Sequence, residues 1–97
     1  MTNKRFSTIH DARYKRLVEM LVQHRVKAGI SQSKLAEKLG ISQPDVSKIE
    51  HFVRRIDVLE FFDWVIVLAD LSGSEPKGIL SDIYLCTSRP FNGENKA

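Results

Sequence analysis

Apolar residues recur every three or four positions along several stretches of the chain, which is the spacing of an amphipathic helix. The first stretch, from about residue 11 to residue 27, carries an apolar stripe made of Tyr14, Leu17, Val18, Leu21 and Val22. Two short stretches follow, and two longer ones begin near residues 57 and 74. The pattern predicts an all-α domain of five helices over residues 11–86. Residues 1–10 are expected to form a polar arm, and residues 87–97 a flexible tail.

The two short stretches predict a pair of helices joined by a tight turn. Ser31 precedes the first and Ser42 the second, and each hydroxyl can accept a hydrogen bond from a free amide of the following turn. Pro44 suits the first turn of the second helix, where a missing N–H costs little, and Asp45 stands at capping-box spacing from Ser42. Gly40 can take the left-handed conformation that ends a helix. The segment is therefore predicted to be a helix-turn-helix.

The ordered set of residues in this motif resembles the Cro and phage-repressor type of helix-turn-helix domain, also called XRE-like. The resemblance covers roughly residues 11–72 and rests on Gln32, a Leu-Ala pair, the turn glycine, Gln43 and a closing Ser-Lys-Ile-Glu. It implies a five-helix, lambda-repressor-like bundle that binds double-stranded DNA. One departure is Pro44, which stands where the resembled repressors often have a second polar residue. Another is Phe52, close to a position where they commonly have glycine or asparagine, so either the helix lengthens or Phe52 packs into the core.

The second helix of the motif is the expected recognition helix. Its apolar positions should point inward, which leaves its other side for the base edges of the major groove. The candidate base-reading residues are Gln43, Pro44, Ser47 and Lys48. Gln43 can pair bidentately with adenine, Lys48 can reach guanine or a phosphate, and Pro44 offers only an apolar contact such as a thymine methyl.

A second group of residues is expected to bind the DNA backbone and so position the domain. The motif match selects Gln32, Ser42, Arg54 and Arg55. The two arginines follow the recognition helix in a loop. The alternative for them is a solvated loop in which Arg55 pairs with Asp57.

The first helix is expected to support the motif from behind. In the resembled repressors, positions that match Arg25 and Glu50 form an ion pair that fastens the first helix to the recognition helix, and the same pair is expected here. The other face of the first helix carries Arg13, Lys15 and Arg16, which are expected to form a solvated surface; the alternative is that they contact DNA.

The fourth helix is apolar over more of its circumference than one packing face needs. This surplus predicts a homodimer, in which two recognition helices reach adjacent turns of the groove. Trp64, Val67 and Leu71 are the candidate interface residues. The alternative is that the fifth helix and the terminal arms cover the surplus within one chain.

Composition changes this interpretation little. The chain has 42% hydrophobic residues and a formal net charge of +3, a mild basicity that fits many surfaces. The single cysteine, Cys86, excludes an intramolecular disulfide, and the three histidines are too dispersed to suggest a metal site. We find no enzyme motif, expect no cofactor, and predict no membrane segment or signal peptide, so the cytoplasm is the expected location.

The sequence therefore predicts a DNA-binding transcriptional regulator, most simply a dimeric repressor. Two alternatives stay open. One is an antitoxin that binds a partner toxin and also represses its own operon. The other is an adaptor that keeps the fold for protein contacts alone.

Overall fold

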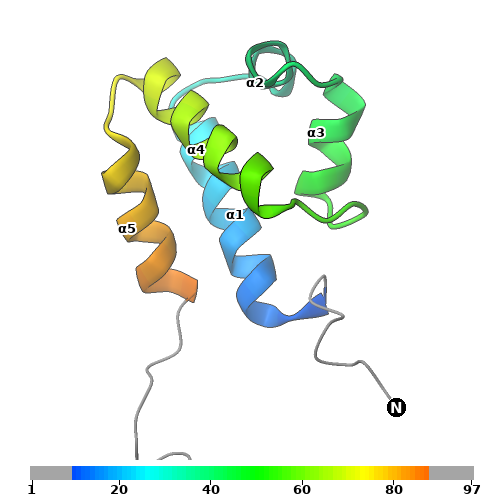
Figure 1. Ribbon diagram of the computed structural model, residues 1–97, viewed down its shortest axis with the longest axis vertical. Helices are drawn as coiled ribbons and strands as arrows, with labels where there is room; N and C mark the ends of the chain where they lie inside the picture. Colours follow the sequence, from blue (N-terminus) through cyan, green and yellow to red (C-terminus); the bar gives the residue numbers. More distant parts are fainter. Residues whose placement is uncertain (1–9, 88–97) are drawn as a thin grey trace, which may run out of the picture.

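The computed structural model describes residues 10–87, which form five helices and the loops that connect them (Figure 1). Their bounds are α1 Ala12–Lys27, α2 Gln32–Leu39, α3 Gln43–Glu50, α4 Val58–Ser72 and α5 Pro76–Thr87. The predicted all-α, five-helix fold is confirmed. Apart from His10 and Thr87, the expected arm and tail lie outside the described residues.

The two motif helices begin where the serine caps predict. Ser31 Oγ accepts a hydrogen bond from the Lys34 backbone N–H at 3.0 Å, and Ser42 Oγ accepts one from the Asp45 backbone N–H at 3.2 Å. Gly40 ends α2 in the left-handed conformation, with φ of 75°. Since each cap satisfies an amide that has no partner inside the helix, these local contacts set the residues at which α2 and α3 begin.

The start of α4 is fixed by a reciprocal cap. The Asp57 carboxylate accepts a hydrogen bond from the Glu60 backbone N–H at 2.8 Å, and the Glu60 carboxylate accepts one from the Asp57 backbone N–H at 3.1 Å. These two reciprocal bonds form a capping box, for which Asp57 and Glu60 have the required spacing of three residues.

The end of α3 takes neither form that the sequence left open. The helix does not lengthen, and Phe52 is half-buried with φ of 63°. The Phe52 N–H donates to the Ile49 carbonyl, and the Val53 N–H donates to the Lys48 carbonyl at 2.8 Å. This pair of bonds closes a helix end of the kind that usually places glycine at the left-handed residue.

A left-handed conformation is unfavourable for a residue with a Cβ atom, by about 1 to 2 kcal/mol. We therefore expect Phe52→Gly to be more stable than Phe52→Ala by about 1 kcal/mol, although both variants lose the same ring. Urea unfolding of the two variants measures this difference. A more stable alanine variant would contradict the left-handed assignment.

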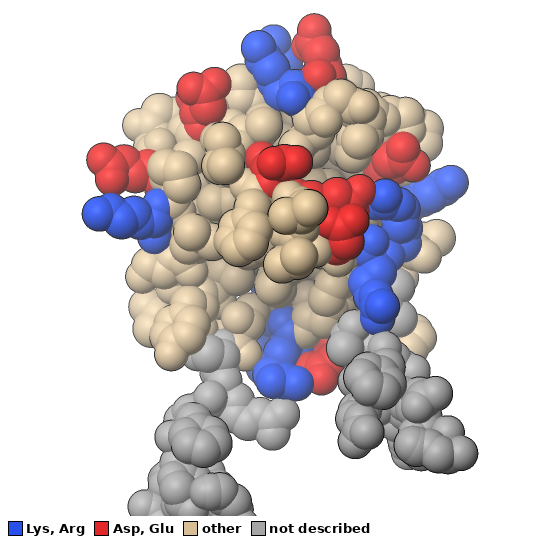
Figure 2. Space-filling view, in the orientation of Figure 1, with Lys and Arg blue, Asp and Glu red and all other residues tan. Residues whose placement is uncertain are grey.

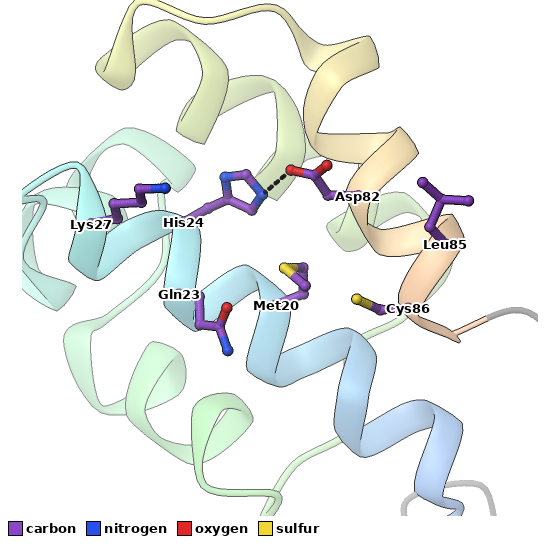
Figure 3. A pocket seen from close by; sticks show the side chains of 7 residues that line it. All are labelled: Met20, Gln23, His24, Lys27, Asp82, Leu85 and Cys86. Atoms are coloured by element: carbon purple, nitrogen blue, oxygen red, sulfur yellow. Dashed lines mark ion pairs between the residues drawn. The ribbon is translucent and has the colours of Figure 1, made fainter.

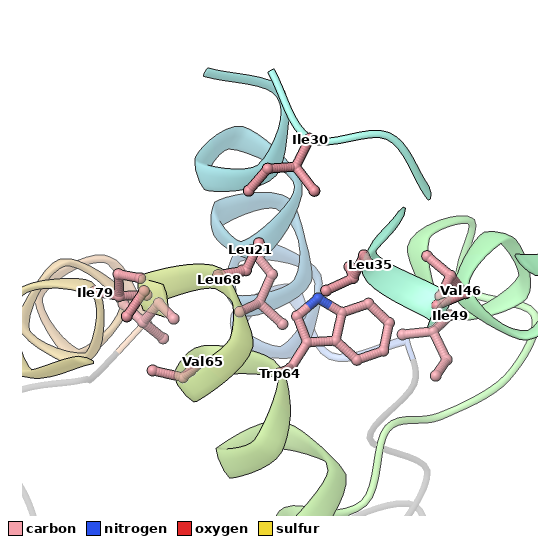
Figure 4. Close-up of a cluster of buried hydrophobic side chains, with 12 residues drawn as sticks. Leu21, Ile30, Leu35, Val46, Ile49, Trp64, Val65, Leu68 and Ile79 are labelled. Atoms are coloured by element: carbon pink, nitrogen blue, oxygen red, sulfur yellow. The ribbon is translucent and has the colours of Figure 1, made fainter. Parts of the chain in front are cut away.

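The core lies where α4 crosses the motif and the supporting helices (Figure 4). Trp64 is only 1% exposed, and its indole ring points toward Leu35, Val46 and Ile49 of the motif. The prediction that Trp64 lies at a dimer interface is therefore wrong. The physical reason is that α4 packs against the motif on one side and against α5 on another. The side of α4 that carries Trp64 therefore faces inward.

The other two interface candidates, Val67 and Leu71, are partly buried and pack against the same core. The exposed apolar side chains of α4 are instead Val58, Leu59, Phe62 and Ile66. None of the described helices is long and apolar enough to span a bilayer.

Candidate nucleic-acid interface

Helix α3 separates its residues between the core and the surface. Val46 and Ile49 are fully buried, whereas Gln43, Pro44 and Lys48 are exposed. Ser47, the fourth candidate base reader, is partly exposed. Figure 1 shows α3 at one side of the molecule, beyond α2 and away from α5. The side chains proposed from sequence to read bases thus occur on a helix whose outer side is available to a ligand.

A buried ion pair fastens α3 to α1. Arg25 Nε lies 2.7 Å from Glu50 Oε2, and Arg25 Nη2 donates to Glu50 Oε1 at 2.8 Å. The two side chains are 12% and 5% exposed. Arg25 Nη1 also donates to the Ile30 carbonyl at 2.8 Å, which ties down the segment that leads into α2. The structure thus contains the ion pair that the resemblance implies, in the bidentate geometry that gives such pairs their directionality.

Two glutamines connect this ion pair to the outer end of α3. Gln32 Nε2 donates to Glu50 Oε1 at 2.8 Å, and Gln43 Nε2 donates to Gln32 Oε1 at 2.7 Å. The Gln43 amide keeps its oxygen and its second N–H, which are the groups needed for a bidentate contact with adenine. The chain of bonds therefore restricts the orientation of Gln43 without using the atoms that would read the base.

The contact between Gln32 and Gln43 is a tertiary contact that the sequence does not predict. Gln32 and Gln43 are the first residues of α2 and α3. Gln43 and Glu50 are seven positions apart on α3, about two turns, so they share one face of the helix, and the Gln32 side chain bonds both of them. Gln32 was predicted to bind phosphate, and the structure shows that it also holds Gln43; one of its side-chain N–H groups is left for a phosphate.

Ser42, another predicted phosphate-binding residue, is exposed at the amino end of α3. Its hydroxyl oxygen accepts the capping hydrogen bond from Asp45. The hydroxyl proton can still be donated, so capping and a phosphate contact are compatible.

The loop between α3 and α4 carries the two candidate arginines. Arg54 Nη2 lies 2.7 Å from Glu60 Oε2, and Arg54 Nη1 donates to Glu60 Oε1 at 3.3 Å. The hydrogen bond with Glu60 raises the pKa of the Arg54 guanidinium further above neutral pH, where an arginine is charged in any case. Arg55 is exposed. The sequence does not predict the contact of Arg54 with Glu60, because it depends on how the loop folds back on α4.

Charge is distributed unevenly over the face that Figure 2 shows. A group of Lys and Arg side chains lies on the right, where Figure 1 places the α3–α4 loop, and Asp and Glu side chains lie across the centre, over α4. A phosphate backbone is attracted to the first region and repelled by the second. The charges thus favour an approach of DNA along α3 and its following loop.

A groove of about 360 Å³ lies between side chains of the packed helices α1 and α5 (Figure 3). His24 Nε2 on α1 lies 3.1 Å from Asp82 Oδ2 on α5, so an ion pair closes one end of the groove when the histidine is protonated. The groove is lined by Met20, Gln23, His24, Lys27, Asp82, Leu85 and Cys86. No residue of α2 or α3 lines it, so it is separate from the surface described above.

The exposed side of α3, the capped turn before it and the ion pair behind it together define a helix-turn-helix DNA-binding domain. A helix-turn-helix family model matches residues 21–63. A solved structure described as an "XRE-family like protein from Pseudomonas syringae pv. tomato str. DC3000" is similar, with 40% identity and a TM-score of 0.66. The match covers 89% of this chain and all of that one. The chain therefore belongs to the XRE family of helix-turn-helix proteins. No curated protein matches it.

Proposed function

We propose that this protein is a sequence-specific transcriptional regulator, a dimeric repressor that inserts α3 into the major groove of an operator. The observation that carries this proposal is the oriented amide of Gln43, which the Gln32–Glu50–Arg25 network holds at the exposed amino end of α3. A polar side chain that is restrained on the surface, with its recognition atoms free, has little entropy to lose on binding.

The exposed chemistry of α3 indicates what an operator half-site should contain. Gln43 favours an adenine, Pro44 an apolar contact such as a thymine methyl, and Lys48 a guanine. Ser47 can contact either a base or the backbone. The phosphate contacts assigned to Gln32, Ser42, Arg54 and Arg55 set the register and add affinity without choosing a sequence.

The experiment that tests the proposal is selection of bound duplexes from a random DNA pool, followed by affinity measurements over a range of salt concentrations. The expected result is an enriched, two-fold symmetric site whose binding constant falls steeply with added salt, because bound phosphates release counterions. No enrichment above the starting pool, with salt-insensitive retention, would favour an adaptor that binds proteins only.

The dimer is proposed to form through the exposed apolar residues of α4, namely Val58, Leu59, Phe62 and Ile66. This patch begins directly after the loop that follows α3, so a two-fold contact there would bring two recognition helices to one face of the dimer. The loop is basic, and α4 carries Glu60, Asp63 and Asp70. In an antiparallel pairing of two α4 helices, Asp70 near the end of one helix would approach the basic loop before the other.

Replacing Ile66 with glutamate is expected to convert the dimer to a monomer, because a two-fold contact would bury two new carboxylates. Ile66 is 55% exposed, so helicity by circular dichroism should be retained. Val26→Glu is the matched control, since Val26 is a 60% exposed aliphatic residue on α1, outside the patch. Sedimentation velocity measures the outcome. A monomeric wild type, or a dimer unaffected by Ile66→Glu, would contradict this interface.

A further inference from the structure

The amino-terminal half of α1 contacts the loop that follows the recognition helix. The Tyr14 hydroxyl oxygen accepts a hydrogen bond from the Ile56 backbone N–H at 3.0 Å, in a partly buried position. Ile56 is the last residue before the Asp57 cap of α4, and it lies beyond the hydrogen-bonded turn that ends α3. Tyr14 thus adds a contact from α1 to a loop that the Arg54–Glu60 pair and the Asp57 cap also hold against α4.

Lys15, the next residue on α1, lies beside the near end of the same loop. Its ammonium nitrogen is 5.6 Å from the centroid of the Phe52 ring, within the range of a cation–π attraction. The backbone of Phe52 is in the left-handed conformation, with φ of 63°. Lys15 is half-buried, and its ammonium group lies over the Phe52 ring. A long side chain of this kind can bury its aliphatic part and keep its charged end at the surface.

The cations near this loop are not equivalent. The charge of Arg54 is balanced by Glu60 at 2.7 Å. Within the part of the chain that the structure describes, no carboxylate forms an ion pair with Lys15, and an aromatic ring leaves the charge of an ammonium group intact. A ligand phosphate is thus drawn to Lys15 without first displacing a carboxylate.

We propose that Lys15 is a phosphate-binding residue of the DNA interface and that Tyr14 is a positioning residue for the adjoining loop. The proposal rests on the DNA-binding function above and extends the interface from α3 onto the first turns of α1. From the sequence, Lys15 was one of three cations on a face expected to be solvated, with DNA contact as the alternative; the proposal selects Lys15 from that set by its position beside the loop.

Lys15→Gln tests the phosphate contact, with Lys77→Gln as the matched control on α5. Loss of one phosphate contact should make the slope of log K against log salt shallower by about 0.9. The wild-type advantage over Lys15→Gln should then be about 3.5-fold larger at 50 mM than at 200 mM salt. The loss should be equal on the selected operator and on random duplex, and Lys77→Gln should match the wild type.

Two failures of this experiment have different meanings. If the wild type binds duplex DNA with a steep salt dependence and Lys15→Gln keeps the same slope, Lys15 is not a phosphate ligand and only this inference is overturned. If the wild type shows no salt-dependent retention of DNA, the proposed function is overturned as well.

Tyr14→Phe tests the positioning role, because it removes one hydroxyl and keeps the ring. We expect affinity for operator and random duplex to fall about two- to tenfold, the equivalent of one hydrogen bond. The effect should largely disappear in an Arg54→Ala, Arg55→Ala background, where the loop has no phosphate contact to lose. Unchanged affinity of the folded variant, or an equal loss in that background, would show that Tyr14 only stabilises the fold.

Discussion

Replacing Arg25 with methionine is expected to lower the free energy of unfolding by about 3 to 5 kcal/mol, because it leaves the Glu50 carboxylate buried without its cation. Glu50 is 5% exposed on its side chain, so water cannot readily replace the lost partner. A domain of this size has a total stability on the order of 5 to 15 kcal/mol, so the variant should be strongly destabilised at room temperature.

Arg13→Met is the matched control for this prediction. Arg13 is also an arginine of α1 and pairs with Asp11 at 3.1 Å, but the two side chains are 45% and 33% exposed. An exposed pair of this kind usually contributes less than about 1 kcal/mol. Urea unfolding of Arg25→Met, Glu50→Gln and the double variant measures the coupling between the partners. If each single change costs under about 0.5 kcal/mol and the effects simply add, the ion pair does not hold α3 in place.

Replacing Gln43 with alanine is expected to weaken binding to the best operator by about 1 to 3 kcal/mol and to relax the preference at one base position in each half-site. The physical reason is the loss of a bidentate contact from an amide that is already oriented by Gln32. Affinities for the selected operator and for its single-base variants measure both effects.

Two further variants test whether the effect of Gln43→Ala is specific to base recognition. Gln23→Ala removes an exposed glutamine of α1 outside the motif and should leave binding unchanged. Gln32→Ala should relax the preference at the same base position as Gln43→Ala, because it frees the Gln43 amide. If Gln43→Ala instead lowers affinity equally for every sequence, Gln43 contacts the backbone and another residue reads that base.

Helix boundaries were predictable from the sequence because they depend on residues close together in the chain. Ser31, Ser42 and Asp57 each satisfy amides three residues ahead, and Gly40 supplies a left-handed residue where one is needed. The Arg25–Glu50 pair could also be anticipated, although only through the resemblance to known repressors, since 25 positions separate the two residues.

Tertiary packing decided which apolar residues of α4 are buried and which are exposed. The sequence shows that this helix is apolar on several sides, but the side that meets α2 and α3 depends on the crossing of helices distant in the chain. Trp64 is therefore in the core, and Leu59 and Ile66 are exposed. Periodicity alone could not distinguish these positions, since all three are large and apolar.

The fold also decided how the polar residues of the interface are held. Gln32 contacts Gln43, Arg54 contacts Glu60, and Tyr14 contacts the backbone of Ile56. Each partner could satisfy its hydrogen bonds in water equally well, so the sequence gives no preference among possible pairs. The pairs are selected when apolar packing fixes the helices and brings the polar groups within about 3 Å of one another. By itself, the sequence determined the helices and the chemistry on their surfaces; the tertiary structure determined which of those groups support one another.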